Sequence, residues 1–152
     1  MNSFLGNLQE LILCQEDRIE WNEYFMSIAL LVSIRSPSKK LKVGSVVVLN
    51  NRIVSSGYNG FGAGVPHVSI SKDGHEINTI HSEQNCIGDA AKRGVAIGGG
   101  TLYVTHFPCI NCTKYIISSG IKKVIYLNDY KNDDIVPELL RLNCIEISKM
   151  DK

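Results

Sequence analysis

The chain has 152 residues, of which 44% are hydrophobic and 20% charged, and its 16 basic and 15 acidic side chains leave a formal net charge of +1. This nearly neutral balance lacks the broad positive field that dominates affinity for duplex nucleic acid, so we expect no duplex partner. The length fits one domain, residues 1–152, that buries a core without disulfide bonds.

Neither a membrane span nor a secretory signal is predicted. The longest apolar runs, such as Ile28–Val32, are far shorter than the roughly 20 residues that cross a bilayer. The first residues lack a positive flank followed by an apolar core, which predicts a cytoplasmic protein. The five cysteines are an odd number and include one C-x-x-C pair, which favours metal or redox chemistry over disulfides.

The first half of the chain predicts two helices and a hairpin. Residues 1–19 carry apolar side chains at positions 4, 5, 8, 11 and 12, which indicates an additional N-terminal helix. Apolar residues at positions 21, 24, 25, 28, 29 and 32 have the spacing of an amphipathic helix, which ends near Arg35. Two β-branched runs, Val43–Leu49 and Arg52–Ser56, flank an Asn-Asn turn and predict a hairpin. A long polar loop follows over 61–79.

Helices and strands alternate in the second half of the chain. Helices are predicted over His81–Lys92, Cys109–Ser119 and Asp133–Leu142, and strands over Thr101–Thr105, Lys123–Leu127 and Cys144–Ile147. Such alternation is typical of βα units that cover a sheet. We therefore expect an α/β fold with three layers, αβα, around a central mixed sheet of about five strands, with the first hairpin as its antiparallel edge.

Four residues at the starts of two predicted helices have the spacing of a catalytic metal site. Cys109 and Cys112 stand three apart, hence on one helix face, and the helix N-terminus favours their thiolate forms. His81 would add a third ligand, which leaves the fourth position of a tetrahedral zinc ion for water. Glu83 would face that water as general base and then general acid. The combination of H-x-E with P-C-x-x-C is typical of zinc-dependent deaminases.

Other interpretations of these residues are open at this point. A fourth side chain, from Cys86 or Cys144, would convert the cluster into a closed structural zinc site. A C-x-x-C pair can also act as a redox dithiol, but that chemistry has no use for His81. A zinc module that binds partners without turnover is the alternative from another functional class. Because a closed site does not need Glu83 beside the histidine, the catalytic interpretation is favoured.

Beyond the metal motif, the sequence resembles the deoxycytidylate (dCMP) deaminase family from Trp21 to about Cys144. The matching stretches are Trp21-Asn22-Glu23-Tyr24-Phe25-Met26, Arg35-Ser36, Val43-Gly44-Ser45-Val46, Gly57-Tyr58-Asn59-Gly60, the run from Phe107-Pro108-Cys109 through Lys123-Val124, and Asp129-Tyr130. The resemblance implies a cytidine-deaminase-like fold and the zinc-dependent hydrolysis of dCMP to dUMP and ammonia, a step that feeds thymidylate synthesis.

The resemblance also implies roles for individual residues. It makes His81, Cys109 and Cys112 the ligands of one catalytic Zn²⁺ per chain and Glu83 the proton shuttle. Substrate contacts are implied for Asn59 with the sugar, for Arg35 and Ser36 with the 5′-phosphate, and for Ser82 and Tyr130 elsewhere around the nucleotide. The residues alone leave alternatives, since Asn59 suits a turn, Arg35 a solvated basic loop and Tyr130 a buried anchor.

Members of this family often form hexamers that dCTP activates and dTTP inhibits at a site that uses a Gly-Tyr-Asn-Gly loop. The same loop is present here, so Gly57, Tyr58 and Gly60 are expected at an effector site, where a triphosphate would carry Mg²⁺. A homo-oligomer is expected for the same reason.

The sequence departs from the family pattern in two places. Ser82 stands where the family usually has alanine, and because a small residue is retained, the zinc chemistry is expected to survive. The loop before His81 lacks the cysteines that bind a second zinc in many relatives, and His67 and His75 are more typical of solvated side chains, so a single zinc is expected. Deaminases of dCTP, of a free nucleoside or of adenosine in tRNA are the rival candidates, although a polynucleotide usually demands a basic track.

Overall fold

The computed structural model describes residues 3–131 and 133–151. The helices in this part of the chain are α1 (Phe4–Leu13), α2 (Trp21–Ser33), α3 (Ser82–Arg93), α4 (Ile110–Ser118) and α5 (Val136–Leu142). The strands are β1 (Gly44–Leu49), β2 (Arg52–Tyr58), β3 (Ser71–Lys72), β4 (His75–Glu76), β5 (Thr101–His106), β6 (Lys123–Asn128) and β7 (Glu146–Lys149).

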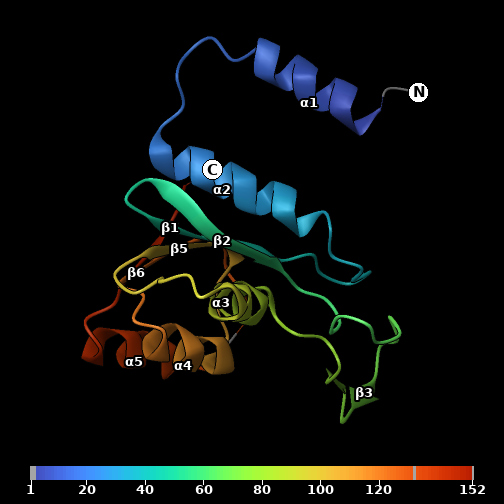
Figure 1. Ribbon diagram of the computed structural model, residues 1–152, viewed down its shortest axis with the longest axis vertical. Helices are drawn as coiled ribbons and strands as arrows, with labels where there is room; N and C mark the ends of the chain where they lie inside the picture. Colours follow the sequence, from blue (N-terminus) through green and yellow to red (C-terminus); the bar gives the residue numbers. More distant parts are fainter. Residues whose placement is uncertain (1–2, 132, 152) are drawn as a thin grey trace.

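The elements form three layers around a five-stranded sheet in the order β2-β1-β5-β6-β7 (Figure 1). Helix α2 covers one face of this sheet, and α3, α4 and α5 cover the other. Strand β1 is antiparallel to β2 and β5, whereas β5, β6 and β7 are parallel. The predicted αβα architecture, the mixed five-stranded sheet and the hairpin at its antiparallel edge are therefore confirmed. The carboxyl ends of the parallel strands share one edge, which is where α/β folds place their ligands.

The α2 face of the sheet is closed by a small aromatic and aliphatic core. Phe25 and Met26 of α2 are each 2% exposed and pack with Tyr103 of the sheet. Gly44 permits this close approach, because a Cβ at Gly44 would lie 2.6 Å from the backbone nitrogen of Ser33. A larger residue there would push α2 away from β1.

The opposite face holds the larger core, which α3 closes at the β2 edge. Cys86 and Ala90 of α3 are buried against this core. Gly57 of β2 lies so close to α3 that an added Cβ would overlap the backbone nitrogen of Cys86 and the carbonyl oxygen of Ser82. The absence of a side chain at Gly57 therefore sets the position of the first turn of α3.

Gly57→Ala is expected to lower the free energy of unfolding by about 1–3 kcal/mol, because the new methyl group meets backbone atoms that cannot rotate away. Gly88→Ala is the matched control, since Gly88 lies in α3 and a Cβ added there would meet no heavy atom within 4 Å beyond its own helix backbone and chain neighbours. The control should be neutral or stabilising by up to about 1 kcal/mol. Urea unfolding of both variants makes the comparison, and equal stability of the two would contradict the packing argument.

The structure corrects two predicted boundaries and one predicted loop. Helix α5 begins at Val136 and not at Asp133, because the carboxylate of Asp133 accepts a hydrogen bond from the Ile135 N–H (3.1 Å) and forms a turn. Strand β7 begins at Glu146 and not at Cys144, because Cys144 has a φ of 54°, which no strand accommodates. The predicted loop over 61–79 contains the short β3–β4 hairpin.

Helix α1 lies within the predicted N-terminal helix of residues 1–19, and Ser3 caps it by accepting a hydrogen bond from the Gly6 N–H (3.1 Å). It has no buried residue, and Figure 1 shows it apart from the sheet, beyond α2. None of the described helices is both long and apolar enough to cross a membrane.

Candidate metal centre

The first half of the site is the start of α3, which the preceding chain holds in place. Gly60, just after β2, pairs with Ile80 through two backbone hydrogen bonds of 3.0 and 2.7 Å. His81 follows as the N-cap residue of α3, and its backbone N–H donates to the Gln84 side chain (3.1 Å). The imidazole of His81 therefore lies at the N-terminal end of α3, where it is exposed.

The second half is the start of α4, where Cys109 is the N-cap residue. The Sγ of Cys109 accepts the Cys112 N–H (3.5 Å), and Thr113 donates its hydroxyl to the Cys109 carbonyl oxygen (2.9 Å). The cysteines three residues apart therefore share the first turn, as their spacing predicts. Cys112 is fully buried and Cys109 half-buried.

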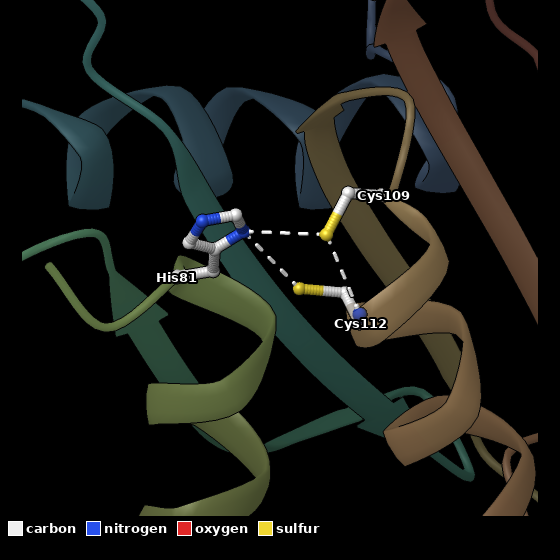
Figure 2. A group of neighbouring side chains, drawn as sticks. All are labelled: His81, Cys109 and Cys112. Atoms are coloured by element: carbon white, nitrogen blue, oxygen red, sulfur yellow. Dashed lines mark hydrogen bonds between the residues drawn. The ribbon is translucent and has the colours of Figure 1, made fainter. Parts of the chain in front are cut away.

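The two helix starts bring one nitrogen and two sulfur atoms together (Figure 2). The Nδ1 of His81 lies 3.5 Å from the Sγ of Cys109 and 3.4 Å from the Sγ of Cys112. A tetrahedral zinc ion with Zn–S near 2.3 Å and Zn–N near 2.0–2.1 Å requires an N···S separation of about 3.6 Å. The observed separations fit this requirement, so these three side chains have the geometry of zinc ligands.

No other His, Cys, Asp or Glu side chain in the described residues joins this group. Cys86 is buried beside Ser55 and Ser45, and Cys144 is exposed at the far end of α5, so the closed site with a fourth cysteine is wrong. His67 is exposed and packs beside Phe61. The side chain of His75 lies outside the described residues.

The two cysteine side chains have opposite pKa shifts. The hydrogen bond from Cys112, assisted by His81, lowers the pKa of Cys109 to about 4 against the effect of burial. The pKa of Cys112 is raised by its hydrogen bond with Cys109, by burial and by the nearby Glu83 carboxylate. The hydrogen bond with Cys109 also raises the pKa of His81. A divalent cation that binds these three side chains displaces the protons that they share in these hydrogen bonds.

Glu83 lies in the first turn of α3 with only 4% of its surface exposed. Burial raises the pKa of its carboxyl, which its own backbone N–H and the Ser82 hydroxyl partly oppose. The Ser82 hydroxyl donates to Oε2 of Glu83 (2.9 Å). Because the Glu83 charge acts on both His81 and Cys112, the carboxylate lies beside the ligand group and not in solvent. A group with a raised pKa in this position suits proton transfer near neutral pH.

Three of the predicted nucleotide contacts follow the ends of two elements, Arg35 and Ser36 after α2 and Asn59 after β2. Arg35 is exposed, whereas Ser36 and Asn59 are 4% and 8% exposed. Both amide atoms of Asn59 are used within the chain, with Oδ1 accepting the Val43 N–H (2.8 Å) and Nδ2 donating to the Leu41 carbonyl oxygen (2.9 Å). Asn59 thus has an internal role that its sequence context, an Asn-Gly turn, did not predict.

The remaining predicted contacts are spread over both sides of the site. Ser82 is fully buried, and its hydroxyl faces Glu83. Tyr130 is 52% exposed, so the buried-anchor alternative is wrong; its ring contacts His106 edge to face, with centroids 6.5 Å apart. His106, the last residue of β5, was not predicted near the site, and because both faces of β5 are buried, no alternation along the strand distinguishes it.

The predicted effector loop has a packing role in the structure. Gly57 is buried against α3, and Gly60 pairs with Ile80. The Tyr58 carbonyl oxygen accepts a hydrogen bond from Nδ2 of Asn85 (2.8 Å). These contacts join β2 to the helix that carries His81 and Glu83, and the effector role stays a prediction.

Comparison with known proteins gives one family. The sequence model of the cytidine and deoxycytidylate deaminase zinc-binding region matches residues 19–128. ComE operon protein 2 of Bacillus subtilis is 40% identical over 139 residues, which cover 89% of this chain and 74% of that protein. Human deoxycytidylate deaminase is 35% identical over 128 residues, which cover 78% and 71% of the two chains, whereas the matched region is only 44% of the Schizosaccharomyces pombe enzyme.

Solved structures agree with the sequence relatives. The crystal structure of dCMP deaminase from the cyanophage S-TIM5 in complex with dCMP and dUMP superimposes with a TM-score of 0.79 at 35% identity, over 89% of this chain and 100% of that one. A tRNA:A34 deaminase structure gives a TM-score of 0.60 at 19% identity, which shows the shared fold alone.

Proposed function

Because the chain belongs to the cytidine and deoxycytidylate deaminase family, a family of zinc-binding hydrolytic deaminases, we propose that it hydrolyses dCMP to dUMP and ammonia. His81, Cys109 and Cys112 would hold the zinc ion, with one ion per chain. The observation that carries the proposal is the 3.4–3.5 Å separation of the His81 nitrogen from the two cysteine sulfurs, beside the buried Glu83 carboxylate. Two solved relatives are named as dCMP deaminases, one with dCMP and dUMP bound.

The reaction needs a nucleophile at neutral pH and a group that moves protons. A zinc ion held by one imidazole and two thiolates would supply the first, by lowering the pKa of a bound water. Glu83 would accept a proton from the attacking water on its carboxylate and deliver it to the cytosine ring nitrogen. It would then take the remaining proton from the hydroxyl group that the water leaves on the ring carbon and deliver it to the amino group, which departs as ammonia while the carbonyl of dUMP forms. Burial supports the uptake of a proton by Glu83, since it raises the pKa of this carboxyl.

The exposed side of the cluster would receive the nucleotide. His81 is exposed there, and Tyr130 at the carboxyl edge of the sheet is half exposed. Arg35 would bind the 5′-phosphate through its planar guanidinium, with Ser36 in the same turn. Ser82 and Asn59 would complete the surroundings of the substrate.

The family resemblance supports three further parts of the proposal. The protein would act in the cytoplasm as a homo-oligomer, with a hexamer as the expected form. It would respond to dCTP and dTTP, with Mg²⁺ on the triphosphate, through the loop that contains Gly57, Tyr58 and Gly60. Velocity curves for dCMP in the presence of each triphosphate test this, and curves that neither compound changes would contradict it.

Ammonia release from deoxycytidine, dCMP and dCTP, measured on the zinc-loaded protein, tests the substrate assignment. We expect a higher kcat/KM for dCMP than for deoxycytidine, because the Arg35 guanidinium favours a phosphorylated substrate. We also expect a higher kcat/KM for dCMP than for dCTP, because a solved relative at 35% identity is a dCMP deaminase. A higher kcat/KM for dCTP or for deoxycytidine would show that this compound, and not dCMP, is the substrate. Absence of turnover with any deaminase substrate would support a binding module instead.

A further inference from the structure

Asn59 connects the end of β2 to the loop over residues 35–43. Its side chain accepts the Val43 N–H at 2.8 Å and donates to the Leu41 carbonyl oxygen at 2.9 Å, while its backbone N–H donates to the Val43 carbonyl oxygen at 3.1 Å. Three hydrogen bonds from one buried residue therefore fix the end of this loop.

Two serine side chains fix the rest of the loop, Ser36 by a bond to Asn59 and Ser38 by a bond within the loop. The Ser36 hydroxyl donates to the Asn59 carbonyl oxygen at 2.8 Å and accepts the Ser38 N–H at 3.2 Å. The Ser38 hydroxyl accepts the Leu41 N–H at 3.3 Å. The loop thus has a defined shape although it contains no helix or strand until β1 begins at Gly44.

The loop is strongly cationic for a chain with a net charge of +1. Its four charged side chains are all basic: Arg35, Lys39, Lys40 and Lys42. No acidic residue occurs in the sequence between Glu23 and Asp73, so nothing nearby in the chain neutralises them. A preformed loop with this charge suits a phosphate group.

The anchor also places the loop next to the metal centre. Gly60, the residue after Asn59, pairs with Ile80, and Ile80 precedes the ligand His81. Pro37 of the loop lies against Gly60, where an added Cβ would be 3.5 Å from its Cδ. Only one residue and one backbone pairing therefore separate the loop anchor from the start of α3.

We propose that Asn59 is a positioning residue for phosphate recognition, acting through the shape of the loop over 35–43, in addition to the sugar contact that the family resemblance implies. The inference rests on the proposed function and refines it. Oδ1 and Nδ2 each retain some hydrogen-bonding capacity, so one residue can have both roles. Loss of the loop's shape should weaken only the binding of ligands that carry a phosphate, whereas loss of a sugar contact should weaken the binding of dUMP and deoxyuridine alike. The two roles can therefore be measured separately.

Titration calorimetry of the zinc-loaded protein with dUMP and with deoxyuridine separates the two roles. In Asn59→Ala, dUMP binding is expected to weaken about tenfold relative to deoxyuridine binding, since two side-chain hydrogen bonds to the loop are lost. Ser38→Ala, which alters the loop without altering Asn59, should change the same ratio in the same direction by about threefold. This second variant carries the test if Asn59→Ala does not fold.

Asn143→Ala is the matched control, because Nδ2 of Asn143 also donates to a carbonyl oxygen at 2.8 Å, but at the exposed C-terminal end of α5. Its dUMP to deoxyuridine ratio should equal that of the wild type. Equal weakening of both ligands in Asn59→Ala would overturn the inference and assign a sugar contact or a general structural role. A wild type that does not prefer dUMP to deoxyuridine would contradict the proposed function itself, and the inference with it.

Discussion

Replacing Glu83 by Gln lowers kcat for dCMP by about 10²–10⁴-fold, which is the usual contribution of a positioned proton-transfer group. The amide has the same shape as the carboxylate and can still accept the hydrogen bond from Ser82, so the fold and the ligand group should remain intact. It cannot carry a proton between the attacking water, the ring and the leaving amine. Steady-state ammonia release measures the loss.

Zinc content, measured on the same Glu83→Gln preparation, distinguishes a lost proton carrier from a lost metal. We expect it to stay near one ion per chain. Glu23→Gln is the matched control, because Glu23 lies in the first turn of α2 but is exposed and outside the ligand group. The control should retain its kcat within about twofold. Full activity in Glu83→Gln would assign the proton transfer to another group.

Replacing Cys112 by Ser removes both the zinc and the activity. The hydroxyl of serine is a far poorer zinc ligand than a thiolate, and Cys112 is fully buried, so no solvent-exposed side chain can take its place. Because bound metal stabilises only the folded form, a chelator should lower the Tm of the wild type but leave that of Cys112→Ser unchanged. Thermal unfolding with and without the chelator, together with zinc analysis, tests this.

Cys144→Ser provides the control for the cysteine substitution. Cys144 is exposed and lies outside the ligand group, so its replacement should change neither the zinc content nor the effect of the chelator. Retention of zinc by Cys112→Ser at the wild-type ratio would show that another side chain completes the site.

The sequence predicted the parts of the site that follow from local structure. Cys109 and Cys112 had to meet because they share one helical turn, and His81 was placed at the start of a second helix by its position before an apolar pattern. That the two helix starts lie side by side depends on the sheet order, which the alternation of helices and strands constrains but does not determine.

The contacts of Asn59 and Gly57 could not be predicted in the same way. The amide of Asn59 reaches residues 16 and 18 positions earlier in the chain, and no local pattern encodes such a pairing. Gly57 allows α3 to pack closely on β2, a contact that its place in a Gly-Tyr-Asn-Gly loop does not indicate. The boundary of β7 differed for a conformational reason, since Cys144 takes a left-handed φ that the sequence gives no reason to expect outside glycine.

X-ray absorption at the zinc edge of the purified protein tests the central claim most directly. One imidazole and two thiolates with a fourth position for water predict two sulfur neighbours near about 2.3 Å and two nitrogen or oxygen neighbours near about 2.0 Å. The same sample should contain one zinc per chain. Three or four sulfur neighbours, or a ratio near two zinc ions per chain, would contradict the account.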